Sequence, residues 1–327
     1  MQKRICLGIE STAHTFGVGI VDSNGEVIAD KRISFSSEFG IKPQEAARSH
    51  LENAKRIIKE ALDEAEIKIS GCDIISFARG PGLGPCLKVG ATCARAIALA
   101  NKKPLVPVNH CLAHIEIGRL DTNAKDPLVV YVSGGNTQII SLEDGAYRIF
   151  GETLDIGLGN MLDSFGRSLG YGFPAGPILD EIYFKGRKYI PLPYTVKGTD
   201  LAFAGLETAA KRLIGKVNKE DLVFSTLHNA FAMLTEATER ALAYTEKKEV
   251  LIVGGVAASK AMRKIMLKMC ISRGAKLLVP QKRFCTDNGA MIAWLGLLEY
   301  ENSGRVDIRK SNVEQRVRLE DEKVTWA

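Results

Sequence analysis

The sequence predicts an α/β protein built from two duplicated lobes. At 327 residues the chain is longer than a typical single domain. Two strand–turn–strand units, residues 5–21 and 128–140, each open a stretch of mixed strands and helices. Glycine turns follow several strands, and ligands of α/β sheets bind at such turns. We therefore expect a first lobe of residues 1–125 completed by 305–327, a second lobe of residues 126–304, and a ligand cleft between the lobes.

The first lobe is predicted to alternate strands with packing helices. Apolar runs of strand length indicate strands, and apolar residues at helical spacing indicate an amphipathic helix that a proline opens. A glycine-rich stretch, GPGLGP from Gly80, precedes a helix of small residues. Because no Gly-Lys-Ser/Thr follows, this stretch is not the loop of P-loop enzymes, and we expect a tight turn that permits close packing. The expected strands are residues 5–9, 17–21, 74–78 and 104–108, and the expected helices are 43–67 and 90–100.

The second lobe repeats the pattern. Its strand at residues 250–253 is followed by a turn that starts with two glycines and by a helix from Lys260. Several such turns in one chain favour nucleotide binding, although close packing of a helix on a strand needs the same glycines. Residues 221–247 carry an apolar stripe at helical spacing and are predicted to be a core helix. A further apolar helix is expected at residues 292–298.

Composition narrows the class of protein. Hydrophobic residues make up 46% and charged residues 25% of the chain, which is ordinary globular usage. The formal charge of +6 is compatible with a polyanionic partner. The seven cysteines are scattered and form no CxxC pair, which favours a reducing compartment and hence the cytoplasm. The N-terminus lacks the pattern of a signal peptide, and no apolar run reaches the length of a membrane span, so we expect no membrane association.

A histidine pair is the strongest chemical signal in the chain. His110 and His114 stand about one helical turn apart, at metal-pinching distance, although such a pair is more often structural. Zinc proteases share this spacing but place a general-base glutamate directly after the first histidine, and Cys111 stands there instead. Asp287 is the best candidate for a third ligand, although capping a helix is the commoner role for an aspartate in that position. Cys111 and Cys285 remain alternative soft ligands.

Eight motifs in one order give the chain a family resemblance. The sequence resembles the universal TsaD/OSGEP family, whose archaeal and eukaryotic members are the catalytic subunits of the KEOPS complex. The wording of the histidine and Tyr131 motifs is closer to that branch than to the bacterial one. The motifs span nearly the whole chain: GIEST from Gly8, GPGLGP from Gly80, NHCLAHIEIG from Asn109, YVSGGNTQ from Tyr131, GETLD from Gly151, GNMLD from Gly159, FAGL from Phe203 and DNG from Asp287.

The resemblance implies a fold, a reaction and a set of ligands. The implied fold is the actin-like, sugar-kinase-like (ASKHA) fold with two duplicated α/β lobes. The implied reaction transfers a threonylcarbamoyl group from its adenylate to the exocyclic amine of the adenosine just 3′ of certain tRNA anticodons. One divalent metal ion, iron or zinc, is implied to bind His110, His114, Tyr131 and Asp287. The substrate, an adenylate or ATP, is implied to contact Tyr131, Val132, Ser133, Gly134, Gly135, Asp163, Gly176, Asp180 and Ser259.

Two of these positions depart from the family pattern, and other functions remain open. Relatives often carry asparagine at the position of Ser259 and glutamate at that of Asp180. Adenylate is a good leaving group, so no serine or cysteine nucleophile is required, and no residue is identified as the proton acceptor. The expected partners are tRNA and the other KEOPS subunits, including a small kinase. The alternatives are a metalloprotease, suggested by the histidine pair, and a nucleotide-binding scaffold that is active only with partners.

Overall fold

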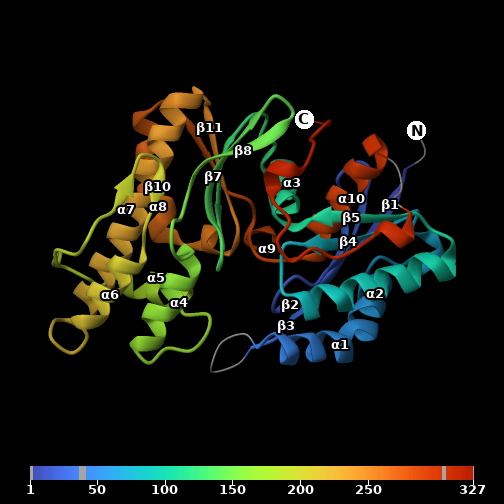
Figure 1. Ribbon diagram of the computed structural model, residues 1–327, viewed down its shortest axis with the longest axis horizontal. Helices are drawn as coiled ribbons and strands as arrows, with labels where there is room; N and C mark the ends of the chain where they lie inside the picture. The colour runs from blue at the N-terminus through green and yellow to red at the C-terminus, as the bar shows by residue number, and fades with distance from the viewer. Residues whose placement is uncertain (1–2, 37–41, 304–306, 327) are drawn as a thin grey trace. The chain divides into compact units, whose positions relative to one another are not determined.

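The computed structural model describes residues 3–36, 42–303 and 307–326. Contacts group the chain into two compact units, residues 1–120 with 286–327 and residues 121–285 (Figure 1). The sequence analysis placed the lobe divisions after residues 125 and 304, whereas these contacts assign residues 286–303 to the first unit. The reason is that helix α10 (Gly289–Ser303) packs on the first unit's sheet.

The first unit contains a five-stranded sheet in the order β3-β2-β1-β4-β5. β1 pairs antiparallel with β2 and parallel with β4, so a hairpin pattern at one edge gives way to a parallel pattern at the other. The predicted strands are all present, whereas β3 was not predicted because its middle residues are charged. The bounds are Ile5–Glu10 for β1, Thr15–Asp22 for β2, Val27–Ser34 for β3, Ile74–Gly80 for β4 and Leu105–Asn109 for β5.

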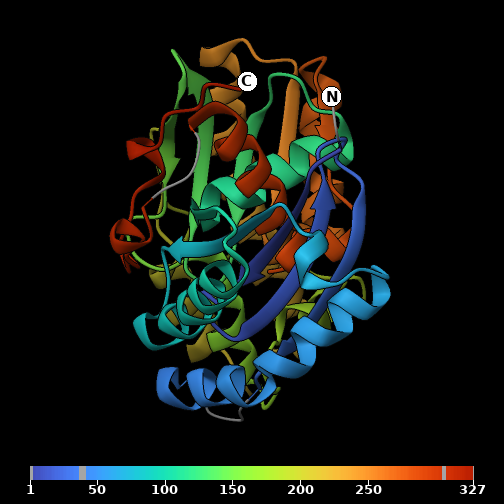
Figure 2. The same ribbon diagram turned by 90° about the vertical axis from the view of Figure 1, so that its right-hand side faces the viewer.

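Helices cover both faces of this sheet (Figures 1 and 2). α1 (Pro43–Glu64) and α2 (Gly84–Asn101) pack together on one face, and α10 lies on the other. Glycines let α10 approach closely, because a Cβ at Gly8 would lie 2.2 Å from Ala293 N and one at Gly19 would lie 2.1 Å from Ala290 N. α3 (His110–Thr122) follows β5, and short 3-10 turns lie at Ile69–Gly71, Ile308–Lys310 and Leu319–Asp321.

The second unit repeats the strand order of the first. Its sheet runs β12-β11-β6-β7-β8, with β6 antiparallel to β7 and parallel to β11. Each strand therefore has a counterpart in the first sheet, as the predicted duplication requires. The bounds are Leu128–Val132 for β6, Thr137–Glu143 for β7, Ala146–Glu152 for β8, Glu249–Val253 for β11 and Lys276–Leu278 for β12, and a small ribbon joins β9 (Val196–Lys197) to β10 (Asp200–Leu201).

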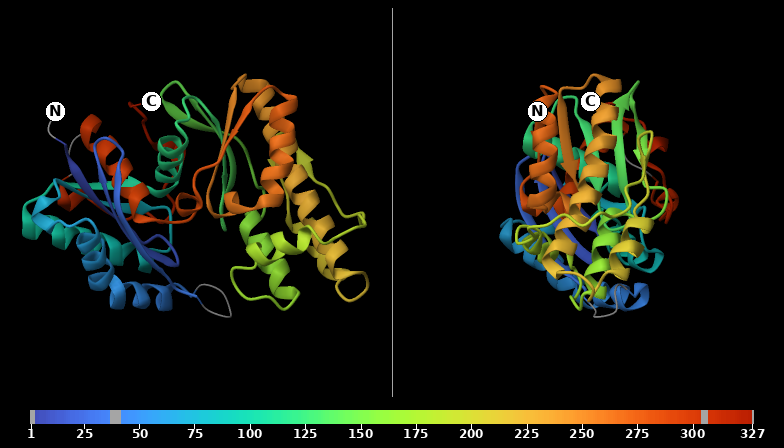
Figure 3. Two further views of the ribbon diagram at one scale, coloured as in Figure 1. Left: turned by 180° about the vertical axis from the view of Figure 1, so that it is seen from behind. Right: turned by 90° about the vertical axis from the view of Figure 1, so that its left-hand side faces the viewer.

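The core of the second unit lies between its sheet and a layer of helices. α7 is the predicted core helix, and most of its apolar residues from Leu222 to Leu242 are buried. α7 packs against α8, and Figure 3 shows the two side by side. The helices are α4 (Leu158–Ser168), α5 (Gly176–Tyr183), α6 (Ala204–Arg212), α7 (Lys219–Thr245), α8 (Lys260–Ser272) and α9 (Lys282–Cys285), with a 3-10 turn at Gly255–Ala258.

The glycine-rich stretch after β4 has the packing role that the sequence indicated. A Cβ at Gly80 would lie 1.8 Å from Glu314 O, and one at Gly82 would lie 2.5 Å from Thr12 O. The following helix, α2, begins within this stretch at Gly84, earlier than the predicted residue 90.

All seven cysteines are free thiols, and six of them are buried. In the part of the chain that the structure describes, no helix is both long enough and apolar enough to cross a membrane.

Candidate metal centre and ligand-binding edge

The two histidines lie on the first turns of a helix that an asparagine starts. Asn109 ends β5, and its side-chain Oδ1 accepts hydrogen bonds from Cys111 N at 2.9 Å and Leu112 N at 3.3 Å. This is the bonding of an N-cap residue, so the helix begins at His110. His110 and His114 then project from neighbouring turns, with ring centroids 4.8 Å apart and ring planes perpendicular. Both side chains are buried.

Asp287 is not the helix cap that its sequence position favoured. The cap of α10 is Asn288, whose Oδ1 accepts a hydrogen bond from Met291 N at 2.9 Å. The Asp287 carboxylate instead faces the histidines, with its Oδ1 3.2 Å from His114 Nε2 and 3.6 Å from His110 Nε2. Arg32 donates to the backbone carbonyl of Asp287 at 2.9 Å and helps to hold this turn in place.

The geometry of these three side chains fits a divalent metal ion. Their ligand atoms all lie within 4.8 Å of one another. Nitrogen and oxygen ligands about 2.1 Å from a shared ion lie roughly 3.0–3.4 Å from each other, close to the two histidine–carboxylate distances. Two histidines and one carboxylate suit zinc and non-haem iron alike. The group of ligand atoms in the described residues includes neither Cys111 nor Cys285, and burial raises the pKa of the Cys285 thiol.

A buried carboxylate orients the first histidine. Glu10 is fully buried at the end of β1, and its Oε2 lies 2.9 Å from His110 Nδ1. Its Oε1 accepts hydrogen bonds from the backbone and hydroxyl of Thr12. A carboxylate on one ring nitrogen fixes the tautomer and leaves Nε2 as the ligand atom, as in many metal sites. The sequence analysis quoted Glu10 only as part of a motif, because no local spacing connects it with His110.

Burial and neighbouring charges shift the pKa values of His110, His114 and Asp287 in different directions. Burial lowers the pKa of His110, but the charges of Glu10 and Asp287 outweigh burial and raise that pKa to about 9. Burial lowers the pKa of His114, and there the carboxylate does not outweigh it. Burial opposes ionisation of Asp287, yet the two histidines hold the pKa of Asp287 well below its usual range. The cluster therefore keeps a carboxylate and a neutral His114 near neutral pH.

In the second unit, five of the predicted substrate residues, 131–135, lie at and after the end of strand β6. Tyr131 and Val132 are the last residues of β6 and are buried. Ser133 begins the turn to β7, and its hydroxyl accepts a hydrogen bond from Asn136 N at 3.1 Å. The carbonyls of Ser133 and Gly134 accept from amides at the start of α4, each at 3.0 Å.

The turn after β11 meets the same edge of this sheet. Gly254 has φ +93°, and a Cβ there would lie 2.3 Å from Val132 O, so only glycine fits. Ser259 caps α8 and donates a hydrogen bond to Asp180, which also accepts from Lys260 N at 2.9 Å and Ala261 N at 3.1 Å. The two positions that depart from the family pattern are thus bonded to each other.

Two other predicted residues lie at helix α4 and at the start of α5. Asp163 lies in α4 and accepts a hydrogen bond from Ala175 N at 2.8 Å, and Gly176 is the first residue of α5. Of the predicted metal ligands, the structure brings His110, His114 and Asp287 together within one unit. Tyr131 belongs to the other unit, and its part in the metal site stays a prediction.

Comparison with known proteins gives one family for this chain. The family model described as TsaD, tRNA N6-adenosine threonylcarbamoyltransferase, matches residues 25–294. A tRNA N6-adenosine threonylcarbamoyltransferase of Thermococcus sibiricus is 49% identical over 325 residues, covering 98% of this chain and 100% of that protein. A probable bifunctional tRNA threonylcarbamoyladenosine biosynthesis protein of Methanocaldococcus jannaschii is 50% identical, and the match covers 98% of this chain but 60% of that protein.

Solved structures of distant proteins share the fold. T. kodakarensis HypF aligns with a TM-score of 0.66 at 16% identity, over 91% of this chain and 48% of that one. Component A of the (R)-2-hydroxyglutaryl-CoA dehydratase of Acidaminococcus fermentans aligns with a TM-score of 0.57 at 15% identity, over 92% of this chain and 99% of that one. These neighbours have the ASKHA fold, and with the two matching sheets they confirm the predicted fold class.

Proposed function

Because the chain belongs to the TsaD family of tRNA N6-adenosine threonylcarbamoyltransferases, we propose that it performs this transfer itself. The threonylcarbamoyl group would pass from threonylcarbamoyl adenylate to the exocyclic amine of the adenosine just 3′ of the anticodon. The observation that carries the proposal is the convergence of His110, His114 and Asp287, with Glu10 behind His110, in a chain that the family covers nearly throughout.

The metal centre would hold one divalent ion, iron or zinc, on His110, His114 and Asp287. When bound, such an ion supplies Lewis-acid stabilisation of charge that develops on carbamoyl or phosphate oxygens. The chain's own contribution is to keep both Nε2 atoms and the carboxylate in place, because Glu10, Asn109 and Asn288 fix the elements that carry them. Tyr131 is proposed as a fourth ligand on the family resemblance alone. Unchanged metal affinity in a Tyr131→Phe variant would rule out Tyr131 as a ligand.

The adenylate would lie along the strand ends of the second unit. Residues 131–135, Asp163, Gly176, Asp180 and Ser259 are the proposed contacts. Adenylate leaves readily once the amine has attacked, so the chain needs to orient the two substrates and exclude water rather than supply a nucleophile. The seven free cysteines support a reducing site of action such as the cytoplasm.

Partner proteins are part of the proposal. The chain spans about 60% of the length of the bifunctional relatives, so those proteins carry a further region that this sequence does not match. We propose that this chain works with tRNA and with the other KEOPS subunits, including a small kinase.

The decisive experiment supplies threonylcarbamoyl adenylate and unmodified tRNA to the chain, with and without partner subunits, followed by nucleoside analysis. Modified adenosine is expected in the wild type and is expected to be lost in a His110→Ala variant. Cys111→Ala is the matched control, since Cys111 is a buried neighbour on the same helix whose sulfur is not among the clustered ligand atoms. Absence of product under every condition, accompanied by peptide cleavage, would favour the metalloprotease alternative. Equal activity in the His110→Ala variant would remove the metal centre from the mechanism.

A further inference from the structure

A short exposed segment after α5 combines aromatic and basic side chains. Residues 184–189 read Phe-Lys-Gly-Arg-Lys-Tyr. Phe184 is 47% exposed and Tyr189 is 51% exposed, although large aromatic side chains are usually buried. Lys185, Arg187 and Lys188 are exposed as well. We call residues 184–189, together with Lys264 and Lys268 of α8, the basic aromatic ridge.

The backbone of the ridge is held firmly by α7. Asp221 accepts hydrogen bonds from Arg187 N at 2.7 Å and Lys188 N at 2.9 Å. Tyr189 donates its hydroxyl hydrogen bond to Asn229 at 2.8 Å. A Cβ at Gly186 would lie 2.3 Å from the Phe224 side chain, so this turn lies directly on the helix. The segment is therefore a preorganised surface, and its side chains need little backbone ordering on binding.

Two lysines of α8, Lys264 and Lys268, also belong to the ridge. Lys264 Nζ lies 5.9 Å from the centre of the Phe184 ring. Burial lowers the pKa of His228, and the positive charge of nearby Lys268 lowers it further. His228 Nδ1 shares a hydrogen bond with the Tyr183 hydroxyl at 3.2 Å. Among the described residues, no ion pair involves the five basic side chains of the ridge, Lys185, Arg187, Lys188, Lys264 and Lys268. Glu181 on α5 is the exposed acid nearest in sequence. Asp221 accepts hydrogen bonds from backbone amides, and its charge also interacts with that of Lys188, without a direct ion pair.

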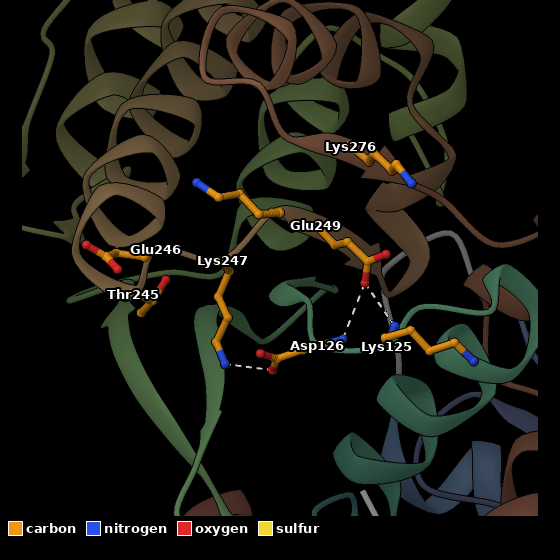
Figure 4. A pocket seen from close by; sticks show the side chains of 8 residues that line it. Lys125, Asp126, Thr245, Glu246, Lys247, Glu249 and Lys276 are labelled. Atoms are coloured by element: carbon orange, nitrogen blue, oxygen red, sulfur yellow. Dashed lines mark hydrogen bonds and ion pairs between the residues drawn. The ribbon is translucent and has the colours of Figure 1, made fainter.

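A lysine-bearing hollow elsewhere on this unit differs from the ridge, because one of its lysines forms ion pairs. It is lined by residues 125–126, 245–249 and 276. There Lys247 pairs with Asp126 at 2.6 Å, and Glu249 accepts hydrogen bonds from the amides of residues 125 and 126 (Figure 4). Lys247 also lies 3.7 Å from the carboxylate of Glu143. Its acids largely balance its lysines and it presents no exposed aromatic ring among its lining residues, so it makes a weak polyanion site and a useful control surface.

We propose that the basic aromatic ridge binds an unpaired stretch of the tRNA substrate. Unpaired bases stack on exposed aromatic rings, and nearby cations contact the phosphates between them. A duplex would engage the cations but leave the two rings without stacking partners. The inference rests on the proposed function for the identity of the RNA, whereas the surface itself is defined by exposure and charge.

The first test measures binding of unmodified tRNA to the chain with its partner subunits. We expect Tyr189→Ala to weaken binding by about 5- to 100-fold, since one base–aromatic stack is lost. Tyr189→Phe keeps the ring and loses only the bond to Asn229, so it is expected to retain most of the affinity. A plot of log affinity against log salt concentration has a negative slope, and the double variant Arg187→Ala/Lys188→Ala should make that slope less steep by about 1.4, because two single-strand phosphate contacts are lost. The matched control is Lys248→Ala/Lys276→Ala in the balanced hollow, with the slope unchanged.

The second test separates this inference from the proposed function. The rate of adenosine modification is measured against tRNA concentration for the wild type and the Arg187→Ala/Lys188→Ala variant. A raised KM for tRNA with an unchanged rate at saturation supports the ridge. If the wild type modifies tRNA and the variant has the same KM for tRNA and the same salt slope, the proposal that the ridge binds RNA is wrong and the proposed function still stands. A wild type that binds tRNA through the ridge without modifying it contradicts the function instead. Normal tRNA binding with loss of a partner subunit would overturn the RNA proposal and assign the ridge to an acidic protein.

Discussion

The proton on His110 predicts how metal affinity depends on pH. The pKa of this imidazole is about 9, because Glu10 and Asp287 outweigh the effect of burial. A metal ion binds the neutral imidazole, so binding at lower pH must displace the proton. Between pH 7 and pH 9 the apparent association constant should therefore rise about tenfold per pH unit, roughly 100-fold in all, and level off above pH 9. His114 adds no slope in this window, because its pKa is lowered.

The variant Glu10→Gln should change both the slope and the plateau. It removes the charge that contributes most to raising the pKa of His110. The pKa then falls towards the ordinary value near 6.5, and the slope between pH 7 and 9 should largely disappear. Above pH 9, where His110 is neutral in both proteins, the variant should bind metal about 10- to 100-fold more weakly, since the imidazole loses its orienting carboxylate. The two affinity curves are therefore expected to approach each other towards pH 7.

The assay is competition for zinc with a chromophoric chelator from pH 6.5 to pH 9.5. Calorimetry in buffers of different ionisation heat should report release of about one proton per zinc at pH 7 in the wild type and distinctly less in Glu10→Gln. Cys111→Ala, with an intact Glu10–His110 pair, should keep the wild-type slope. A wild-type affinity that is constant between pH 7 and 9, or an identical slope in Glu10→Gln, would refute the reasoning.

Two further predictions concern helix α10. Replacing Asn288 with alanine removes the hydrogen bond that caps Met291 N, and should lower the free energy of unfolding by about 1–2 kcal/mol in denaturant titrations. Metal binding should also weaken, because Asp287 adjoins the cap. Asn288→Asp should recover most of the stability, and an equal loss in both variants would contradict the capping role. Gly19→Ala places a Cβ 2.1 Å from Ala290 N and should destabilise the protein by about 3 kcal/mol or prevent folding, whereas Gly172→Ala, in open space, should be nearly neutral when the two are compared by thermal unfolding.

Much of the fold could be read from local patterns. Strands β1, β2, β4, β5 and β6 and helix α7 lie where periodicity placed them, because each buries one strongly apolar run. β3 was missed, since Asp30, Lys31 and Arg32 mask its alternation. Helix α10 was expected, but periodicity carries no information about which sheet it packs on. That choice depends on Gly8 and Gly19, which leave room for the helix backbone against the first sheet.

The sequence by itself determined the order of most strands and helices, the repeat of the strand–turn–strand unit and the one-turn spacing of His110 and His114, since all three depend on residues close together in the chain. Only the tertiary structure placed the Asp287 carboxylate beside His114, since the two residues lie 173 positions apart in the sequence yet 3.2 Å apart in space. It also decided that Asn288 rather than Asp287 caps α10, and that Glu10 orients His110. These contacts join segments far apart in sequence, where local spacing has no bearing and the packing of helices on the sheet sets the distance.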